Sequence, residues 1–489
     1  MALVKSLQLN RFACPDCRGD LGQISENDLQ CRGCHQHFAI CSGVPSLLPG
    51  GTAVPPFEAS LAVSVLIMAR NEAGNLGHML TEMRAVLEDL EIEYELVVID
   101  GQSKDATAEI AKNHGGRVFV QEKTGYGNGF REGLRRCRGQ YILTFDADGS
   151  HDPNYIRVLW QHRDRAELVV GSRYIDRGEA WMPVSRVILS RALNIFMTTT
   201  LDIAAQDVSS GFRLYHRSAL SGIELEGRDF DVLIELLVKI KLEGYRVLEV
   251  PFLYKPRLEG ASSARLFRFA VSYLTSAWRL WRVRNSTSTA DYDGRAYHSR
   301  IYPQLYWQRR RYKIVNRFLD GAYSGILDVG CGSSKIIQSL PGAVGLDFSL
   351  RKLRYVRTTN PLVVHGSVLA LPFKNESFDI VLCSQVIQHI PETDVAIKEL
   401  LRVLKPGGRF ILGTSDFGSW QWPLIEGVYK RMIPDGYAEE HIDPLTRENV
   451  VAMVEGMGAD FLDEDFILKA EWVGLFRKRT TRPPNAQAG

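Results

Sequence analysis

The sequence predicts an α/β protein in which a small cysteine-rich head precedes two separate domains of alternating strands and helices. Four cysteines form two close pairs within the first fifty residues. Apolar runs that end in carboxylates then recur at residues 61–72, 95–100 and 139–148, and a second series of this kind starts at residue 325. A chain of 489 residues is also too long for one ordinary core, since a domain averages about 150 residues.

The composition is that of a globular protein, with 45% apolar and 24% charged residues. Lysine and arginine number 59 against 57 aspartates and glutamates, so the overall charge does not favour a nucleic-acid partner, and we expect none. No apolar run reaches the roughly 18 residues needed to span a bilayer, and the N-terminus lacks a signal-peptide pattern. We therefore expect a cytoplasmic protein.

The head contains two Cys-x-x-Cys pairs, Cys14 with Cys17 and Cys31 with Cys34. This spacing suits tetrahedral zinc, whose four thiolate bonds would replace the core that so short a segment cannot build. Closed four-sulfur coordination leaves no open position for a substrate, so the expected role is structural. Four unligated core cysteines are the alternative.

With its continuation from Cys41 to Pro49, the head resembles the small zinc-ribbon proteins that bind and activate methyltransferases. The resemblance implies a partner-binding ribbon. A module that only adds stability is an equal alternative, and the sequence does not show whether the ribbon touches either domain.

The first domain opens with a buried strand over Leu61–Met68, then Glu72 and a helix from Ala73. The next strand ends at Asp100 and a third ends in Asp146-Ala-Asp148. Ligands of open α/β sheets bind at these carboxyl ends. Two carboxylates one residue apart can both face a divalent cation, Mg²⁺ or Mn²⁺, whose other ligands are diphosphate oxygens.

The order of these motifs resembles family 2 glycosyltransferases of the Rossmann-like GT-A fold, and in particular their polyprenyl-phosphate (dolichyl-phosphate) mannosyltransferase branch, over residues 60–265. Further motifs that carry the resemblance are Gly125–Gly133, Val170–Tyr174, Asp207–Arg213 and Glu249–Pro251. The resemblance implies a nucleotide-sugar donor and a lipid-phosphate acceptor.

Carried over by position, Glu72, Asp100 and Asp146 would bind the nucleoside part of the donor, and Asp148 would hold the metal together with Asp146. Ser150 stands where relatives often carry glutamine. Arginine forks suit phosphate oxygens, although each could equally form an ordinary ion pair. The candidates are Arg173, which we favour, Arg213 and Arg257.

A hydroxyl acceptor would need a general base, whereas a phosphate acceptor is already an anion and needs only positioning and charge screening. Asp207 is the candidate base, or else it orients Arg213. Residues 265–284 combine arginines with aromatics and contain no acidic residue. They predict either peripheral contact at the cytoplasmic face of a membrane or a helix packed between domains.

The second domain begins with a strand that runs into a glycine turn, Asp328-Val-Gly330-Cys-Gly332. Nineteen residues beyond Asp328, a second strand ends at Asp347, the spacing of a carboxylate that holds ribose hydroxyls. The third glycine of a dinucleotide-binding turn is missing, because the turn reads Gly330-Cys-Gly332-Ser-Ser-Lys335. A nicotinamide cofactor is therefore disfavoured.

With the segments 366–373, 377–383 and 404–412, this domain resembles class I S-adenosylmethionine methyltransferases of the doubly wound fold, over about residues 320–415. By position, the cofactor would contact Asp328, Gly330, Gly332, Asp347, Ser367 and Val368. Ser367 replaces the usual aspartate, and Ser334 stands where a third glycine often sits, so a degenerate regulatory domain stays an alternative. His389 is a candidate base for methyl transfer, or a packing residue.

We therefore predict a zinc ribbon over 1–50, a glycosyltransferase domain over 60–285 and a methyltransferase domain over 295–480. The preferred function is metal-dependent sugar transfer to a polyprenyl phosphate in glycolipid biosynthesis, with methylation of a glycan or small molecule. One alternative is a ribbon-activated methyltransferase that acts on tRNA or protein, with the sugar-transfer domain independent. Another is an envelope-assembly scaffold with degenerate sites.

Overall fold

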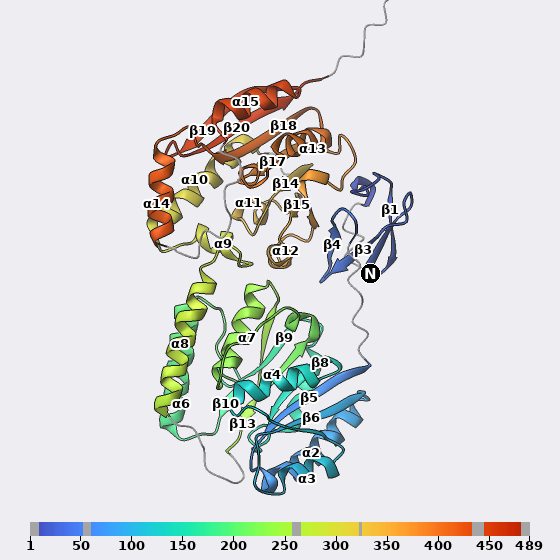
Figure 1. Cartoon of the computed structure of the whole chain (residues 1–489), viewed down its shortest axis with the longest axis vertical. Helices are drawn as coiled ribbons and strands as arrows, with labels where there is room; N and C mark the ends of the chain where they lie inside the picture. Colours follow the sequence, from blue (N-terminus) through green and yellow to red (C-terminus); the bar gives the residue numbers. More distant parts are fainter. Residues whose placement is uncertain (1–8, 52–59, 257–265, 322–324, 433–444, 481–489) are drawn as a thin grey trace, which may run out of the picture. The chain divides into compact units, whose positions relative to one another are not determined.

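The computed structural model describes residues 9–51, 60–256, 266–321, 325–432 and 445–480 (Figure 1). The chain divides into two compact units. One unit is Pro56–Arg284, and the other combines Met1–Pro55 with Asn285–Gly489. Both units have a sheet with helices, so the predicted α/β class is confirmed. The three domain boundaries inferred from the sequence stay a prediction.

The unit Pro56–Arg284 has a seven-stranded sheet of order β12-β9-β11-β8-β5-β6-β7 among its described residues. Only β11 runs antiparallel to its neighbours, and the other pairs are parallel. The strands are β5 (Leu61–Ala69), β6 (Tyr94–Asp100), β7 (Arg117–Val120), β8 (Gly139–Asp146), β9 (Leu168–Ser172), β11 (Arg213–His216) and β12 (Val247–Pro251).

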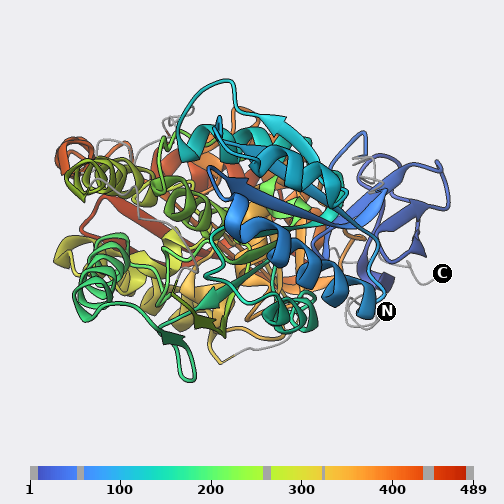
Figure 2. The same ribbon diagram turned by 90° about the horizontal axis from the view of Figure 1, so that it is seen from below.

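Helices cover both faces of this sheet. Alternate residues of its strands face opposite sides and therefore contribute to two separate cores. Val65 and Leu143 join one core, and their neighbours Leu66 and Ile142 join the other. Helix α2 packs against the first core, and Figure 2 shows it crossing in front of the strands. The helices are α2 (Ala73–Asp89), α3 (Thr107–Asn113), α4 (Tyr126–Arg136), α5 (Ile156–Gln161), α6 (Val184–Leu201), α7 (Asp231–Leu242) and α8 (Leu266–Arg284). A small ribbon pairs β10 (Glu179–Ala180) with β13 (Leu253–Tyr254).

The other unit is built on an eleven-stranded sheet of order β1-β2-β3-β4-β16-β15-β14-β17-β18-β20-β19. Its strands from the head are β1 (Leu21–Ser25), β2 (Asp28–Cys31), β3 (His37–Cys41) and β4 (Val44–Leu47). The remaining strands are β14 (Ile326–Val329), β15 (Val344–Asp347), β16 (Val363–Gly366), β17 (Phe378–Ser384), β18 (Leu404–Ser415), β19 (Ala459–Ile467) and β20 (Glu471–Lys478). The helices are α9 (Tyr292–Tyr297), α10 (Tyr302–Leu319), α11 (Lys335–Gln338), α12 (Leu350–Val356), α13 (Thr393–Val403), α14 (Gln421–Met432) and α15 (Arg447–Gly456).

The cysteine-rich head is joined to the second domain through this sheet. Strand β4 lies parallel to β16, with Ser46 opposite His365. The rings of Phe12 and Phe373 are 5.3 Å apart, and both belong to a core shared by the head and the domain. The sequence left open whether the head contacts a domain; in the structure it contacts the second domain through a continuous sheet and a common apolar core.

None of the helices in the described ranges is long and apolar enough to cross a membrane.

Candidate active sites

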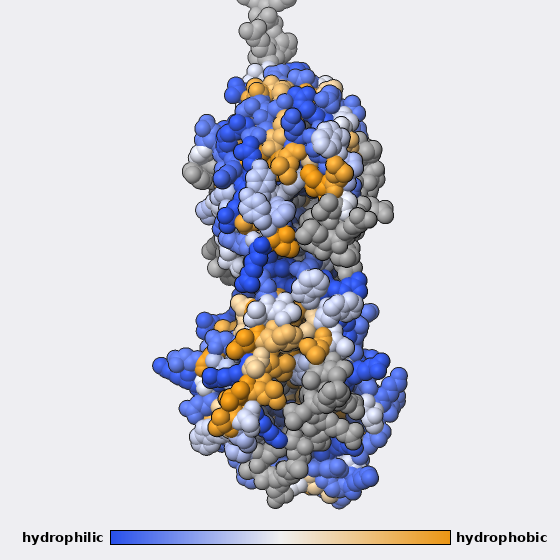
Figure 3. Space-filling view, turned by 90° about the vertical axis from the view of Figure 1, so that its left-hand side faces the viewer, coloured by the Kyte–Doolittle hydropathy of each residue, from blue (hydrophilic) through white to orange (hydrophobic). Residues whose placement is uncertain are grey.

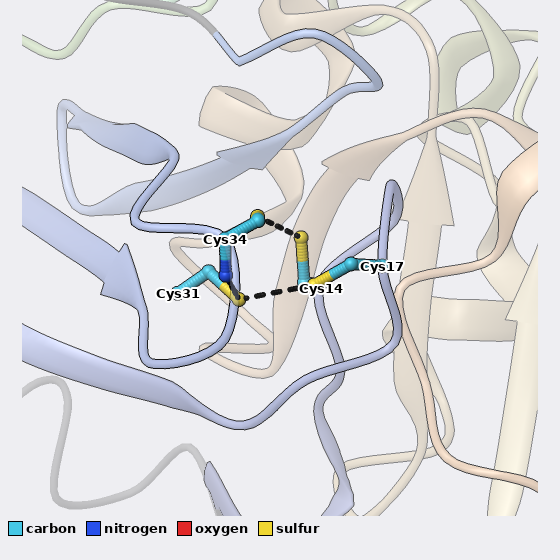
Figure 4. A group of neighbouring side chains, drawn as sticks. All are labelled: Cys14, Cys17, Cys31 and Cys34. Atoms are coloured by element: carbon cyan, nitrogen blue, oxygen red, sulfur yellow. Dashed lines mark hydrogen bonds between the residues drawn. The ribbon is translucent and has the colours of Figure 1, made fainter.

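The four cysteines of the head gather at one point between two turns (Figure 4). Their sulfur atoms all lie within 4.8 Å of one another, with Cys14 and Cys34 at 3.7 Å and Cys17 and Cys31 at 3.4 Å. Ligands 2.3 Å from a tetrahedral zinc ion lie about 3.8 Å apart, so this cluster has the size and donor chemistry of a zinc site.

In the unit Pro56–Arg284, three carboxylates lie at the carboxyl ends of neighbouring central strands. Asp100 is opposite Ala69 at the end of β5, and Asp146 is opposite Met68 on the other side of that strand. Asp148 follows two residues later and is 6% exposed. The residues that the sequence motifs predicted for this edge therefore lie at the carboxyl ends of the two strands that flank β5.

Asp148 is oriented by Ser150. The Ser150 hydroxyl and backbone N–H donate hydrogen bonds to Asp148 Oδ1 at 2.5 and 3.1 Å. Serine at this position, a departure from the family pattern, thus fixes the rotamer of the proposed metal ligand.

The loop before β11 lies against Asp146, since a Cβ atom on Gly211 would be 3.3 Å from both of its carboxylate oxygens. Within this loop, Asp207 is fully buried and forms a bidentate ion pair with Arg173, with both N–O distances 2.7 Å. Burial opposes the charge on Asp207, but the Arg173 guanidinium outweighs it and holds the pKa of Asp207 below its ordinary value. A carboxylate held in this way is a weak proton acceptor.

Arg213 is fully buried and donates to the backbone carbonyls of Ser210, Leu233 and Val208. It forms no pair with Asp207, whose arginine partner is Arg173. The hydrogen bonds of Asp207 therefore favour Arg173 over Arg213 as the arginine that it orients, and the geometry of Arg213 favours a structural role over a phosphate contact.

Glu72 precedes α2, and its Oε2 accepts a hydrogen bond from Asn75 at 2.7 Å. The start of that helix is tied to the first residue of α3, because the Glu72 backbone N–H donates to Thr107 Oγ1 at 2.8 Å. Arg257 lies outside the described residues.

His151 also lies at this site, although no periodic pattern or motif in the sequence indicated it. It is 3% exposed, and its Nε2 lies 3.6 Å from Asp146 Oδ2. Burial lowers the pKa of His151 to about 4 despite the nearby Asp148 carboxylate, so the ring is neutral at physiological pH. Its neighbours are the rings of Phe145, Phe212, Phe252 and Tyr254.

In the other unit, the glycine turn after β14 approaches the end of β15. The Gly332 N–H donates to Asp347 Oδ2 at 2.7 Å. Gly330 has a φ of 71°, and a Cβ atom there would lie 2.0 Å from a methyl group of Val386. Only glycine therefore allows this turn.

Three buried polar atoms near this turn have no hydrogen-bond partner: Asp328 Oδ2, Ser384 Oγ and Gln385 Nε2. Asp328 and Ser384 lie on the adjacent strands β14 and β17, and Gln385 follows directly. Unpaired buried polar atoms are costly, so their clustering at the carboxyl ends of the strands fits a polar ligand such as the amino-acid part of S-adenosylmethionine.

Asp328 is surrounded by protein and lies near Asp347. Burial and that second carboxylate raise the pKa of Asp328 to about 8, and burial likewise raises the pKa of Asp347. Asp293 of α9, which sequence reasoning missed, caps the turn by accepting from Ser333 N at 3.0 Å and pairing with Lys352 at 3.2 Å.

The predicted adenine-side residues open a short 3₁₀ turn, Val368–Ala370. Ser367 caps it, since its Oγ accepts from Leu369 N at 3.2 Å, and Val368 is buried. Ser334 similarly caps α11. Both serines that depart from the family pattern therefore act as helix caps. His389 is half-buried at the end of the turn Ile387–His389.

Comparison with known proteins supports the two predicted domain types. Residues 64–223 match the model of glycosyl transferase family 2, and residues 327–412 match a methyltransferase domain. An uncharacterized glycosyltransferase of Mycobacterium bovis is 32% identical over 205 residues, which are 41% of this chain and 88% of that protein. The chain belongs to glycosyl transferase family 2. It also carries a methyltransferase domain.

Among other relatives of this family 2 glycosyltransferase, the dolichol-phosphate mannosyltransferase of Pyrococcus furiosus is 29% identical over 234 residues. That match covers 45% of this chain and 64% of the relative, so this chain spans less than two thirds of its length. A crystal structure described as a SAM-dependent methyltransferase, possible histamine N-methyltransferase, from Thermotoga maritima is 21% identical. The structural match covers 36% of this chain and 95% of the Thermotoga maritima chain, with a TM-score of 0.31.

Proposed function

We propose that this family 2 glycosyltransferase transfers a sugar from a nucleotide-sugar donor to a polyprenyl phosphate, and that its second unit methylates the product or a related glycan with S-adenosylmethionine. The observation that carries the first half is the row of carboxylates Asp100, Asp146 and Asp148 at one edge of the sheet. Hard oxygen ligands of this kind suit Mg²⁺ or Mn²⁺ bound to a diphosphate.

The roles that we propose for sugar transfer rest on the family resemblance and are supported by the geometry. Asp148, and with it Asp146, would hold the metal, and Glu72 and Asp100 would contact the nucleoside. Arg173 is the best placed phosphate contact, because Asp207 fixes its guanidinium while 10% of its side chain remains exposed. The low pKa of Asp207 agrees with an acceptor that is already an anion and needs no general base.

The relative from Pyrococcus furiosus bears the name dolichol-phosphate mannosyltransferase, and this supports a lipid-phosphate acceptor for the present chain. Zinc would be held by Cys14, Cys17, Cys31 and Cys34. S-adenosylmethionine would be bound by the turn from Asp328 to Gly332, by Asp347 and by the segment at Ser367 and Val368, with His389 as the candidate base.

The proposal is tested with a panel of nucleotide sugars, Mg²⁺ or Mn²⁺, and a short water-soluble polyprenyl phosphate. We expect one donor to be consumed with formation of a lipid-linked sugar, only with metal. Asp148→Asn should lose at least about a hundredfold in rate, whereas Asp164→Asn, a surface change in the same unit, should leave it unchanged. Donor consumption that is independent of metal and of Asp148 would contradict the proposal.

A further inference from the structure

Exposed apolar side chains of the unit Pro56–Arg284 concentrate on two helices, α6 and α8, and on the residue Trp181 just before α6. In the described part of this unit, all exposed large apolar side chains except Val120 and Phe230 lie there. They are Trp181, Val184, Ile188, Leu189, Ile195, Phe196, Leu274, Trp278, Trp281 and Val283. Figure 3 shows apolar side chains gathered on one face of this unit. We call these ten residues the α6–α8 surface.

The two helices contact each other and are anchored by their opposite faces. Met197 and Leu201 of α6 and Tyr273 and Leu280 of α8 are buried in one core. The outer faces are nevertheless strongly apolar: Ile188 and Ile195 are 63% and 65% exposed, and Trp278 is 62% exposed. An apolar surface of this extent on a protein marks an interaction site.

The charge of the α6–α8 surface indicates which kind of partner it fits. Neither helix contains an acidic residue, and the exposed charged side chains on their described parts are Arg186, Arg191 and Arg282. The Arg282 guanidinium lies 5.1 Å from the centre of the Trp278 ring. Helices that combine exposed tryptophan and aliphatic residues with arginine bind the interface of anionic bilayers, where the apolar groups enter the acyl boundary and the arginines meet phosphate.

The inner face of α6 is tied to the candidate sugar-transfer site. The Asn194 side-chain amide donates to Ser209 Oγ at 3.2 Å, and its oxygen accepts from Val208 N at 2.8 Å. Ser209 Oγ in turn accepts from Arg173 at 2.8 Å. One side chain therefore connects the helix that carries half of the α6–α8 surface to the pair Arg173–Asp207.

From these observations we propose that the α6–α8 surface docks this enzyme on an anionic lipid bilayer. The inference rests on the proposed function, because docking on a bilayer serves an enzyme whose acceptor is a lipid phosphate. Docking places the loop of Arg173 and Asp207 next to the membrane, where the phosphate of a membrane-embedded acceptor is found.

The test is flotation of the full chain with vesicles of phosphatidylcholine alone or mixed with phosphatidylglycerol. We expect binding to the anionic vesicles that weakens with salt. The double variant Ile188→Ser with Ile195→Ser, and separately Trp278→Ser, should reduce that binding about tenfold or more, since each removes apolar area from the membrane. Val120→Ser, which changes an equally exposed residue on β7, should not reduce it.

Sugar transfer to the water-soluble acceptor needs no membrane, so this assay separates a failure of docking from a failure of the proposed function. Activity in this assay also shows that each variant is folded. Variants that keep this transfer but lose vesicle binding support the proposal. An absence of vesicle binding by a wild type that is active on the soluble acceptor would overturn it. So would a concentration-dependent dimer in light scattering that the surface variants abolish, because a second copy would then be the occupant.

Discussion

The raised pKa of Asp328 predicts that the affinity for S-adenosylmethionine depends on pH. The cofactor's amino-acid part carries a cationic ammonium group, and if Asp328 binds it as proposed, Asp328 must be a carboxylate. In the free protein the pKa of Asp328 is about 8, so at pH 6.5 roughly thirty molecules are protonated for each one ionised, a cost of about 2 kcal/mol. We expect the dissociation constant to fall about tenfold per pH unit between pH 6 and pH 7.5.

The stability of the free unit should show the opposite trend. The folded pKa of Asp328 lies above the ordinary 3.8 of an unfolded chain, so the folded state binds the proton more tightly. Its contribution to stability is complete below about pH 4 and is lost as the pH rises through about 8. Thermal unfolding of this unit should therefore move to lower temperature over that range, and the cofactor should counteract the change.

Titration calorimetry of the full chain in buffers of different ionisation enthalpy measures both the affinity and the proton release. We expect close to one proton released at pH 6.5. Asp328→Asn should bind weakly with no pH dependence, while Asp460→Asn, an exposed change in the same unit, should behave like the wild type. A wild-type affinity that stays constant from pH 6 to pH 7.5, with no proton released, would refute the reasoning.

Three further predictions concern structure. Cys14→Ser should lose bound zinc, measured by elemental analysis, and should lower the unfolding temperature of the methyltransferase unit because Cys14 lies in the shared core. The control Cys41→Ser should retain the metal, and an equal zinc content in the two variants would count against the site. Gly330→Ala should abolish cofactor binding in calorimetry, since its Cβ would lie 2.0 Å from Val386, whereas Gly456→Ala, which meets no atom within 4 Å, should bind normally. Arg213→Met should lower the free energy of unfolding by roughly 3 kcal/mol in urea titrations, because it removes the hydrogen bonds that a buried guanidinium donates to three backbone carbonyls. An effect no larger than that of the exposed control Arg165→Met would show that these bonds contribute little.

The strands and their ends were predictable, because an apolar run that ends in a carboxylate is typical of a buried parallel strand and of its carboxyl end. The sequence places Asp100, Asp146 and Asp328 at strand ends, and the structure confirms these positions. The paired cysteines likewise converge as their spacing predicts.

Side-chain partners over long sequence distances were not predictable in the same way. Two arginines, Arg173 and Arg213, looked alike in their motifs, yet one pairs with Asp207 and the other is enclosed by backbone carbonyls. That difference depends on how β9 and β11 pair, which local patterns do not encode. His151 and Asp293 were missed for the same reason.

The junction of head and domain is a third case. Strand β4 is short, and its pairing with β16 joins residues more than three hundred positions apart. The ribbon's backbone also holds the segment after the adenine-side turn, where Ala13 N donates to Pro372 O at 3.0 Å and Lys374 N donates to Arg11 O at 2.9 Å. The resemblance to methyltransferase-binding ribbons suggested a partner, and the structure shows it within the same chain.

We propose that the two transferase sites of this chain act on one product. Mass spectrometry of the lipid product tests this, after incubation with the nucleotide sugar accepted by the enzyme, metal, a polyprenyl phosphate and S-adenosylmethionine. We expect a glycosylated lipid that gains a methyl group only when the cofactor is present, that is absent with Asp148→Asn, and that stays unmethylated with Asp328→Asn. A glycosylated lipid that never gains a methyl group, while the methyltransferase modifies an unrelated acceptor such as RNA, would contradict the joint function.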